Sequence, residues 1–475
     1  MKILLINPPC RTPSVLPLGL GYIAGVLRRD GHMVSMLDLN AEKRTLGSLE
    51  IEISNADCDV IGIGGLTTTY SFIKEVSAMI RKINPELRII VGNMVSTSYP
   101  ELLLKNSEVD ICVIDEGEET VRELIPRIKD FPHIEDIPGI AFKKGSDVVR
   151  TGARDRIKDL DALPFPAWDL FPMEVYINNP LHNEYGRRSM NISAVRGCPF
   201  QCIYCSRPFG SHVYKRTPES VIAEIKALID GYKIEFIGFS DDLFIVDKRW
   251  VEHFCDLLIN ARLKIGWGSS ARVNLIDRAM LEKMKKSGCE VLSYGFESGS
   301  QKILDAMKKG AKVKDAENAI RLTRQARIRV EGSFMIGMIG ETADTVKETV
   351  DFIKRNDLGL NRFFYTTPFP GTPLYGIARS IGRIPDDEDA YVSSLGEMCK
   401  NLPVNLTDMT DAELRDLKKK AESDITENFS IRVKTDMAIE EFRRIAADIR
   451  SVFRSRGLIP AIGRSLGKIK NRISH

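Results

Sequence analysis

The sequence lacks the features of a secreted protein, of a membrane-spanning protein and of a general nucleic-acid binder. Its start, Met1 to Pro9, reaches a pair of prolines too early to serve as a signal peptide. No apolar run approaches the roughly 18 residues that cross a bilayer. The net charge of +3 over 475 residues gives no reason to expect a polyanionic partner such as nucleic acid. We therefore expect a cytoplasmic protein of two or three domains.

Cysteines suited to a disulfide framework are missing as well. Six of the nine cysteines stand singly, several of them inside apolar runs, which is typical of buried free thiols in a reducing compartment. These six are Cys10, Cys58, Cys112, Cys255, Cys289 and Cys399. The other three lie together and carry the chemical information.

Those three, Cys198, Cys202 and Cys205, are spaced C-x3-C-x2-C within one short stretch. Thiolates this close in sequence wrap one centre from a single loop. A structural zinc ion needs a fourth Cys or a His, and the nearest candidate, His212, belongs to no paired zinc knuckle. A 4Fe–4S cluster held by three cysteines keeps one iron open, and that iron can chelate a small molecule. A zinc loop or a chance grouping is the alternative.

The residues around these cysteines match one family. Gly197, Pro199, Tyr204 and the pair Arg207-Pro208 accompany the spacing, and the whole loop resembles the cluster loop of the radical S-adenosylmethionine (SAM) superfamily. The resemblance implies that the open iron takes the amino and carboxylate groups of SAM. It also implies that Tyr204 is the aromatic residue that precedes the third cysteine and lies near SAM.

Residues 1–145 alternate between short apolar runs and amphipathic runs, which predicts a doubly wound parallel sheet of the Rossmann-like kind. The expected strands are Lys2–Asn7, Met33–Leu39, Val60–Gly64, Arg88–Val91 and Ile111–Ile114. The expected helices are Gly19–Arg29, Ser71–Ile83, Pro100–Lys105 and Thr120–Ile128. Ligands of such sheets bind at the carboxyl ends of the strands.

No G-x-G-x-x-G opens a helix after the first strand, so a dinucleotide site is not expected. Instead, Pro17–Ala24, Asp59–Ile63, Thr67–Tyr70 and Glu116–Thr120 resemble the cobalamin-binding domain that many radical SAM enzymes carry. The resemblance implies that cobalamin contacts Leu18, Gly19, Thr67, Thr68, Thr69, Tyr70, Gly92, Glu116, Gly117 and Glu118.

Two local departures bear on the cobalamin prediction. The stretch Val91–Met94 stands where relatives often have a glycine pair and a histidine. Asp30-Gly31-His32 looks like the start of a cobalt-ligating D-x-H motif, but it follows the first helix and reads better as a helix-to-strand turn. We therefore expect cobalamin without a protein histidine on the cobalt.

The middle of the chain predicts a partial (β/α)6 TIM barrel over residues 186–385, after a linker at 146–185 whose Pro164–Asp169 is extended and apolar. The expected helices are Pro218–Asp230, Trp250–Arg262, Asp277–Ser287, Val313–Ala326 and Thr342–Asn356. The expected strands are Glu235–Ser240, Ile265–Ala271, Val291–Phe296, Glu331–Ile336 and Asn361–Thr366, with one more leading into the cysteine loop.

The ends of these strands look like the SAM-binding positions of the superfamily. The resemblance places Ser240 and Asp241 at the methionine amino group, Arg272 at the SAM carboxylate and Glu297 at the ribose. Gly337 would let the backbone approach the adenine, and Phe369 completes the set. The alternative for the acidic residues is that they are solvated strand ends or helix caps. For Arg272, considered without its neighbours, a structural role without SAM is favoured. No catalytic residue is assigned.

The last part, residues 386–475, predicts helices that end in a basic tail. Two apolar stripes at helical spacing lie among nine Lys or Arg residues beyond Phe442. The stripes are Phe442, Ile445, Ile449, Val452 and Phe453, then Ile462, Leu466, Ile469 and Ile473. This pattern predicts either peripheral contact with a membrane surface or a helix docked on the barrel.

Together the resemblances imply a cobalamin-dependent radical SAM enzyme that uses a 4Fe–4S cluster, SAM and cobalamin, and that takes electrons from a flavodoxin- or ferredoxin-type donor. Such an enzyme cleaves SAM reductively to a 5′-deoxyadenosyl radical, and most relatives then methylate an unactivated carbon. The substrate is a small molecule, with a lipid or isoprenoid suggested only by the tail. The alternatives are a radical cyclase, oxidase or carbon–carbon coupling enzyme, and a non-catalytic Fe–S redox protein.

The cysteine assignment is testable by substitution. Replacing Cys198, Cys202 or Cys205 by Ala should abolish SAM cleavage, because two thiolates are too few to hold four irons. Iron content and 5′-deoxyadenosine after anaerobic reconstitution measure this. The matched controls Cys58→Ala and Cys399→Ala should keep both. A Cys198→Ala protein that still forms 5′-deoxyadenosine would contradict the assignment.

Overall fold

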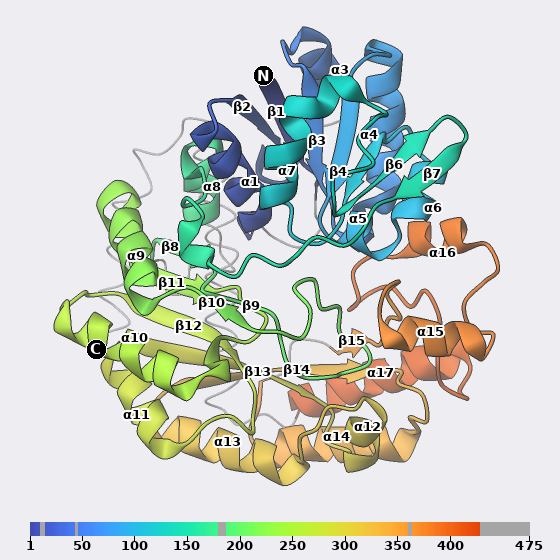
Figure 1. Ribbon diagram of the computed structural model, residues 1–475. Coiled ribbons are helices and arrows are strands. Elements are labelled where there is room, and N and C mark those ends of the chain that lie inside the picture. The colour runs from blue at the N-terminus through green and yellow to red at the C-terminus, as the bar shows by residue number, and fades with distance from the viewer. Residues whose placement is uncertain (10–14, 43–45, 179–186, 360–362, 428–475) are drawn as a thin grey trace, which may run out of the picture.

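Two sheets form the body of the protein in the computed structural model, which describes residues 1–9, 15–42, 46–178, 187–359 and 363–427. Figure 1 shows the first sheet above the second, with the last helices of the described chain at the side of both. The expectation of a Rossmann-like sheet followed by a partial barrel and a helical extension is confirmed.

The first sheet has the strand order β2-β1-β3-β4-β5-β6-β7. Its first five strands are parallel, as expected: β1 (Lys2–Asn7), β2 (Met33–Asp38), β3 (Val60–Gly64), β4 (Arg88–Gly92) and β5 (Ile111–Val113). An antiparallel hairpin, β6 (Ile140–Lys144) and β7 (Asp147–Arg150), extends this sheet across the predicted boundary at residue 145. Gly145 has a positive φ of 63°, which suits the tight turn between the two strands.

Helices cover both faces of the first sheet. On one face lie α1 (Leu18–Arg29) and α7 (Glu118–Leu124), and on the other lie α3 (Leu46–Asn55), α4 (Tyr70–Ile83) and α6 (Pro100–Lys105). The strands are therefore apolar on both sides, so that Ile3 and Leu5 join one core and Leu4 and Ile6 join the other. Three short helices, α2 (Leu39–Glu42), η1 (Thr67–Thr69) and α5 (Met94–Ser98), begin at the carboxyl ends of strands.

The second sheet is an open barrel of six parallel strands in the order β15-β14-β13-β12-β11-β8. They are β8 (Ser189–Ile192), β11 (Phe236–Phe239), β12 (Gly266–Ala271), β13 (Cys289–Glu297), β14 (Arg329–Ile336) and β15 (Phe364–Tyr365). The helices between them are α9 (Pro218–Tyr232), α10 (Lys248–Asn260), α11 (Arg278–Lys286), α12 (Gln301–Ala306), α13 (Val313–Gln325) and α14 (Ala343–Arg355). The expected six βα units are present, with β15 shorter than predicted.

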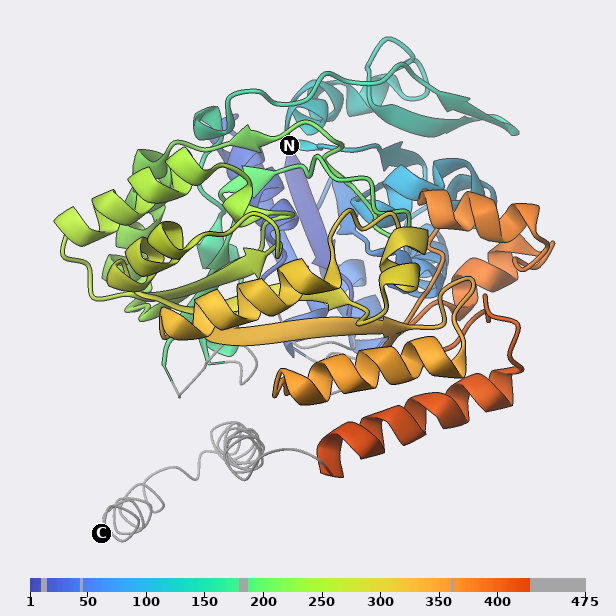
Figure 2. The ribbon, with the colours of Figure 1, turned by 90° about the horizontal axis from the view of Figure 1, so that it is seen from below.

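After the barrel the chain forms α15 (Pro373–Ser380), α16 (Glu388–Ser394) and α17 (Asp411–Glu427). Figure 2 shows α17 alongside α14, at the β15 edge of the barrel. There the Glu422 carboxylate accepts a hydrogen bond from the Phe363 backbone N–H at 2.8 Å. No helix of the described chain is long and apolar enough to cross a membrane. The basic tail lies outside the described residues, so its membrane contact stays a prediction.

The linker joins the two sheets by packing against α1. The backbone N–H of Ala167 donates to the Gly21 carbonyl at 3.0 Å. A side chain at Gly21 would lie only 2.8 Å from Pro166, so the close approach needs a glycine there. From the linker, α8 (Met173–Ile177) reaches the end of the first sheet, where the Tyr176 hydroxyl donates to the buried Asp38 carboxylate at the end of β2.

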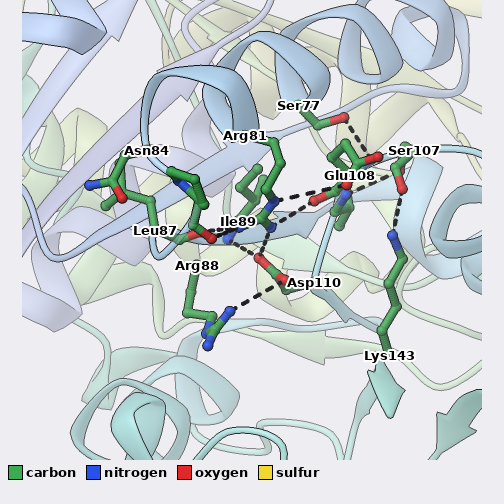
Figure 3. A network of polar contacts seen from close by, with 12 residues as sticks. Ser77, Arg81, Asn84, Leu87, Arg88, Ile89, Ser107, Glu108, Asp110 and Lys143 are labelled. Atoms are coloured by element: carbon green, nitrogen blue, oxygen red, sulfur yellow. Dashed lines mark hydrogen bonds and ion pairs between the residues drawn. The ribbon is translucent and has the colours of Figure 1, made fainter. Parts of the chain in front are cut away.

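The opposite, amino edge of the first sheet is held by a polar network around Asp110 (Figure 3). The Asp110 carboxylate accepts from the Arg81 guanidinium at 2.7 Å and from the Ile89 backbone N–H at 2.8 Å, and the Arg88 guanidinium lies 3.8 Å away. Asp110 is buried, so these donors replace the water that the charge gives up. The network ties the start of β4 to the start of β5.

Asp110→Asn should lower the free energy of unfolding by about 2 kcal/mol, because it replaces charge-assisted hydrogen bonds by weaker ones at a buried position. Thermal or urea unfolding followed by circular dichroism measures the loss. The control Asp136→Asn removes an exposed ion pair with Arg127, and should change stability little. Equal unfolding midpoints for the two variants would contradict the role given to Asp110.

Candidate active site at the facing strand ends

The cysteine loop lies between two short antiparallel strands, β9 (Val195–Arg196) and β10 (Tyr214–Lys215). At its start Gly197 has a φ of 93°, and a Cβ there would lie 1.9 Å from the carbonyl oxygen of His212. Only glycine fits this position. The Gly197 N–H donates to the Asp242 carboxylate at 3.0 Å. The loop therefore starts from a fixed backbone position.

The three cysteines differ in exposure. Cys202 is buried, Cys198 is half-buried and Cys205 is exposed. Desolvation by the surrounding protein atoms, and to a lesser degree the neighbouring thiols of Cys202 and Cys198, raise the pKa of Cys205 to about 12. A bound metal would displace the thiol proton outright.

Within the described ranges, no three Cys, His, Asp or Glu side chains converge on a single ion position. His212, the nearest histidine in the sequence, is exposed. Three cysteines on one loop are a donor set that fits a 4Fe–4S cluster, in which each thiolate binds a different iron. The ligand roles of the three cysteines stay a prediction.

Asp241 follows β11 and has one free carboxylate oxygen. Its Oδ1 accepts from the Ser193 hydroxyl at 2.9 Å and from the backbone N–H groups of Ala194 and Val195 at 2.8 and 3.1 Å. Its Oδ2 is buried and has no hydrogen-bond partner. Burial, only partly offset by these donors, raises the pKa of Asp241 to about 7.

Arg272 follows β12 and is buried next to the cysteine loop. Its Nη1 lies 3.7 Å from the Cys202 sulfur, and its guanidinium carbon lies 3.6 Å from the centre of the Phe200 ring. Its Nε and Nη2 are buried without a partner.

Unpartnered buried groups of opposite charge are costly, so they indicate a ligand that carries the complementary charges. A free carboxylate oxygen at Asp241 and free N–H groups at Arg272 suit the ammonium and the carboxylate of an amino acid. The methionine part of SAM has both. The residues present therefore fit SAM at the predicted strand ends.

Glu297 ends β13 in a buried network of three side chains. Its Oε1 accepts from the Tyr204 hydroxyl at 3.0 Å and from the Lys309 ammonium at 2.8 Å, and Lys309 lies 3.1 Å from the same hydroxyl. Burial and the Glu297 carboxylate raise the pKa of Tyr204. Two predicted SAM residues are thus brought together. Lys309 was not predicted, because its loop has no motif that links it to Glu297.

The remaining predicted SAM residues lie at neighbouring strand ends. Gly337 has a φ of 94°, and Glu341 accepts from its N–H and from that of Met338. Burial raises the pKa of Glu341 to about 7, although these two donors favour its carboxylate. Ser240 is exposed beyond β11, and Phe369 packs partly buried after β15. Glu341 was missed from the sequence as a residue that shapes this turn.

The carboxyl edge of the first sheet offers an apolar surface beside β1 and β3, where the strand order reverses. Val15 and Leu66 are each 43% exposed there, which is high for large apolar side chains. Gly19 and Thr68 are exposed, and a Cβ at Gly92 would meet no atom within 4 Å. Leu18 is partly exposed, whereas Thr67 and Thr69 are buried. Such a surface fits a large flat cofactor at the usual ligand edge.

Three residues predicted to contact cobalamin have other partners. Tyr70 is fully buried, and its hydroxyl donates to Asp389 of α16. Glu116 and Glu118 are buried against Arg196 of β9, and Gly117 between them packs on Ile23. The polar atoms of Tyr70, Glu116 and Glu118 thus have partners inside the protein, and their contact with cobalamin stays a prediction.

His32 lies at the other end of the first sheet, where its Nδ1 is 3.2 Å from the terminal amine of Met1. Since β2 begins at Met33, this is the amino edge, opposite the edge with the exposed apolar surface. The structure thus places the D-x-H-like stretch in a turn, as the sequence indicated.

Comparison with known proteins defines the class. Residues 192–353 match the model of the radical SAM superfamily, and residues 10–125 match the B12 binding domain. An uncharacterized methyltransferase of Pyrococcus horikoshii is 31% identical over 395 residues, which cover 80% of this chain and 84% of that protein. The anaerobic magnesium-protoporphyrin IX monomethyl ester cyclase of Synechocystis is 30% identical over 397 residues, covering 80% and 77%.

Among solved structures, the radical SAM methyltransferase TsrM of Kitasatospora setae, with cobalamin and a 4Fe–4S cluster bound, superposes with a TM-score of 0.72. The match covers 91% of each chain at 18% identity, and so supports the fold. The chain belongs to the radical SAM superfamily, in the cobalamin-dependent group with an N-terminal B12 binding domain. It is an enzyme, and its cofactors are a 4Fe–4S cluster, SAM and cobalamin.

Asp241→Asn should weaken SAM binding about tenfold while the iron content stays unchanged, because the amide turns a donor toward the ammonium but still accepts from residues 193–195. Equilibrium dialysis of the anaerobically reconstituted protein measures the affinity. Asp256→Asn, which removes only a partly exposed ion pair with Lys283, is the control and should bind SAM normally. Unchanged affinity in Asp241→Asn would contradict the assignment.

Proposed function

We propose that the protein is a radical SAM methyltransferase that methylates an unactivated carbon of a small-molecule substrate. The SAM-dependent part of the proposal is carried by two buried groups with unpartnered atoms, Asp241 at the end of β11 and Arg272 next to Cys202. A protein that only carried electrons would have no need of groups near its cysteine loop that match the charges of an amino acid. The Pyrococcus horikoshii relative named as a methyltransferase supports the choice of reaction.

In this proposal the chain's own groups bind and orient. Cys198, Cys202 and Cys205 hold the cluster, and the N–H of Arg272 that lies near the Cys202 sulfur stabilises its negative charge. Asp241 and Arg272 hold the methionine part of SAM. Glu297, whose position is set by Lys309 and Tyr204, holds the ribose hydroxyls. Gly337 allows the backbone to approach the adenine.

The first sheet holds cobalamin on the exposed surface formed by Leu18, Gly19, Leu66, Thr68 and Gly92. When bound, the cluster and SAM supply a radical that removes a hydrogen atom, and cobalamin supplies the methyl group. The α8 segment over β2 and the α16 segment over α4 exclude water from two sides of this edge. We place the cobalamin domain at residues 1–150, the linker at 151–185 and the SAM barrel at 186–385.

A radical cyclase that uses the same cofactors without methyl transfer is the second candidate. It is favoured by the 30% identity to the Synechocystis cyclase, which covers 77% of that protein. The unpartnered SAM-like site suits both reactions equally. Their products distinguish them, because only methyl transfer from SAM leaves S-adenosylhomocysteine.

The proposal is tested with purified protein, reconstituted anaerobically with iron, sulfide and cobalamin and then given SAM and a strong reductant. We expect about one cobalamin per chain, 5′-deoxyadenosine and S-adenosylhomocysteine. Electron paramagnetic resonance of the Co(II) form should show no splitting from an axial protein nitrogen, because the first domain carries no cobalt-ligating D-x-H-x-x-G motif after its first strand.

The outcomes separate the candidates. Deoxyadenosine without S-adenosylhomocysteine would favour the cyclase-type reaction. If a protein fully loaded with iron and cobalamin formed neither product, the result would favour a non-catalytic redox protein. Comparison of metabolites between a deletion strain and its parent then identifies the substrate.

A further inference from the structure

A buried ion cluster joins the two sheets immediately before the cysteine loop. The Arg196 guanidinium donates through Nη1 to Glu116 at 2.7 Å and through Nη2 to Glu118 at 2.6 Å. All three side chains are at most 7% exposed. Arg196 belongs to β9 and stands two residues before Cys198, whereas both glutamates follow β5 of the first sheet. This ion cluster therefore connects the loop that holds the three cysteines to the first sheet, which belongs to the B12 binding domain.

The rest of the surroundings hold Arg196 in one orientation. Its guanidinium carbon lies 5.4 Å from the ring centre of Tyr22 in α1 and 5.1 Å from that of Phe209 in the cysteine loop. The second oxygen of Glu116 accepts from the Ile157 backbone N–H at 3.0 Å, so the linker is attached at the same point. Burial opposes the charge on Arg196, but Glu118 and Glu116 outweigh it and raise the pKa.

Stability alone does not account for this arrangement. Two carboxylates face one guanidinium, so the buried set carries an excess negative charge, and buried ion pairs are often no more stabilising than apolar residues of the same size. The ion cluster does supply a defined geometry. A planar guanidinium that bridges two carboxylates fixes the distances and angles between the three groups.

On each side of the ion cluster, a short stretch of chain leads to the element that the cluster would position. From Arg196 the chain passes through Gly197, whose N–H is held by Asp242, directly to Cys198. From Glu116 the chain runs back three residues to the end of β5. A displacement at the cluster would therefore move the cysteine loop relative to the edge of the first sheet.

We propose that Arg196, Glu116 and Glu118 are positioning residues that set the distance and orientation between the Fe–S cluster and cobalamin. The inference rests on the proposed placement of these cofactors at Cys198–Cys205 and at the carboxyl edge of the first sheet. Both glutamates act through Arg196. The substrate carbon must meet both cofactors in turn, so this distance decides how well the two half-reactions are coupled.

The direct test measures the distance between the two paramagnetic centres. Holoenzyme frozen with Co(II) cobalamin and the reduced cluster should give a single narrow distance in pulsed dipolar electron paramagnetic resonance. Glu118→Gln keeps the shape but removes one charge, and Arg196→Lys keeps the charge but cannot bridge two carboxylates. Both variants should lose the narrow distance while iron and cobalamin per chain stay at the wild-type level.

The control is Arg28→Gln, which removes an exposed ion pair between α1 and Asp169 of the linker and should keep the narrow distance. Variants of the ion cluster that also keep it would overturn the proposal. The proposal would also be overturned if the variants that change the distance lost iron or cobalamin as well. The ion cluster of Arg196, Glu116 and Glu118 would then be needed only for folding. If Arg196→Lys does not fold, Glu118→Gln carries the test.

The test also separates this inference from the proposed function on which it rests. Wild-type protein that binds both cofactors but gives no dipolar coupling would refute their placement. Wild-type protein with a narrow distance that the variants share would refute only the positioning role.

Discussion

The structure depends on one constraint, which is that the carboxyl edges of two parallel sheets face each other. Segments that follow strands of the first sheet contact the ends of the second: the backbone of Leu16, after β1, hydrogen-bonds the side chain of Asn191 near the end of β8. Ser98, after β4, packs on Gly371 beyond β15. Since ligands of parallel sheets bind at this edge, facing edges bring two ligand sites together. The same arrangement buries charged loops, which must then find partners across the boundary.

Charges at this boundary fall into two groups with different consequences. Arg196 with its two glutamates is satisfied within the protein and joins the two sheets, and Asp389 with Tyr70 joins α16 to α4. Asp241 and Arg272 keep unpartnered atoms although they are buried. Leaving such atoms without a partner is costly, so a ligand with matching charges gains affinity from a site that is already organised for it.

Coverage of the first sheet explains where cobalamin can lie. The ends of β1 and β2 are closed by Tyr176, whose hydroxyl joins Asn7 and Asp38, and the region of α4 is closed by α16. The exposed apolar side chains Val15 and Leu66 stand between these covered regions. The covering segments come from the linker and from the chain beyond the barrel, so all parts of the protein contribute to this edge.

The sequence by itself determined the βα order of both sheets, the cysteine loop and the strand ends that bear Asp241, Arg272 and Glu297, because these depend on local periodicity and on spacing within one stretch. It did not predict the β6–β7 hairpin at the boundary, since a turn with one glycine is a weak signal. Only the tertiary structure decided the partners of Glu116, Glu118, Tyr70 and Lys309. Arg196 is 80 residues from Glu116, and Asp389 is 319 residues from Tyr70. Contacts of that kind follow from how the sheets pack, and no pattern within a single stretch encodes them.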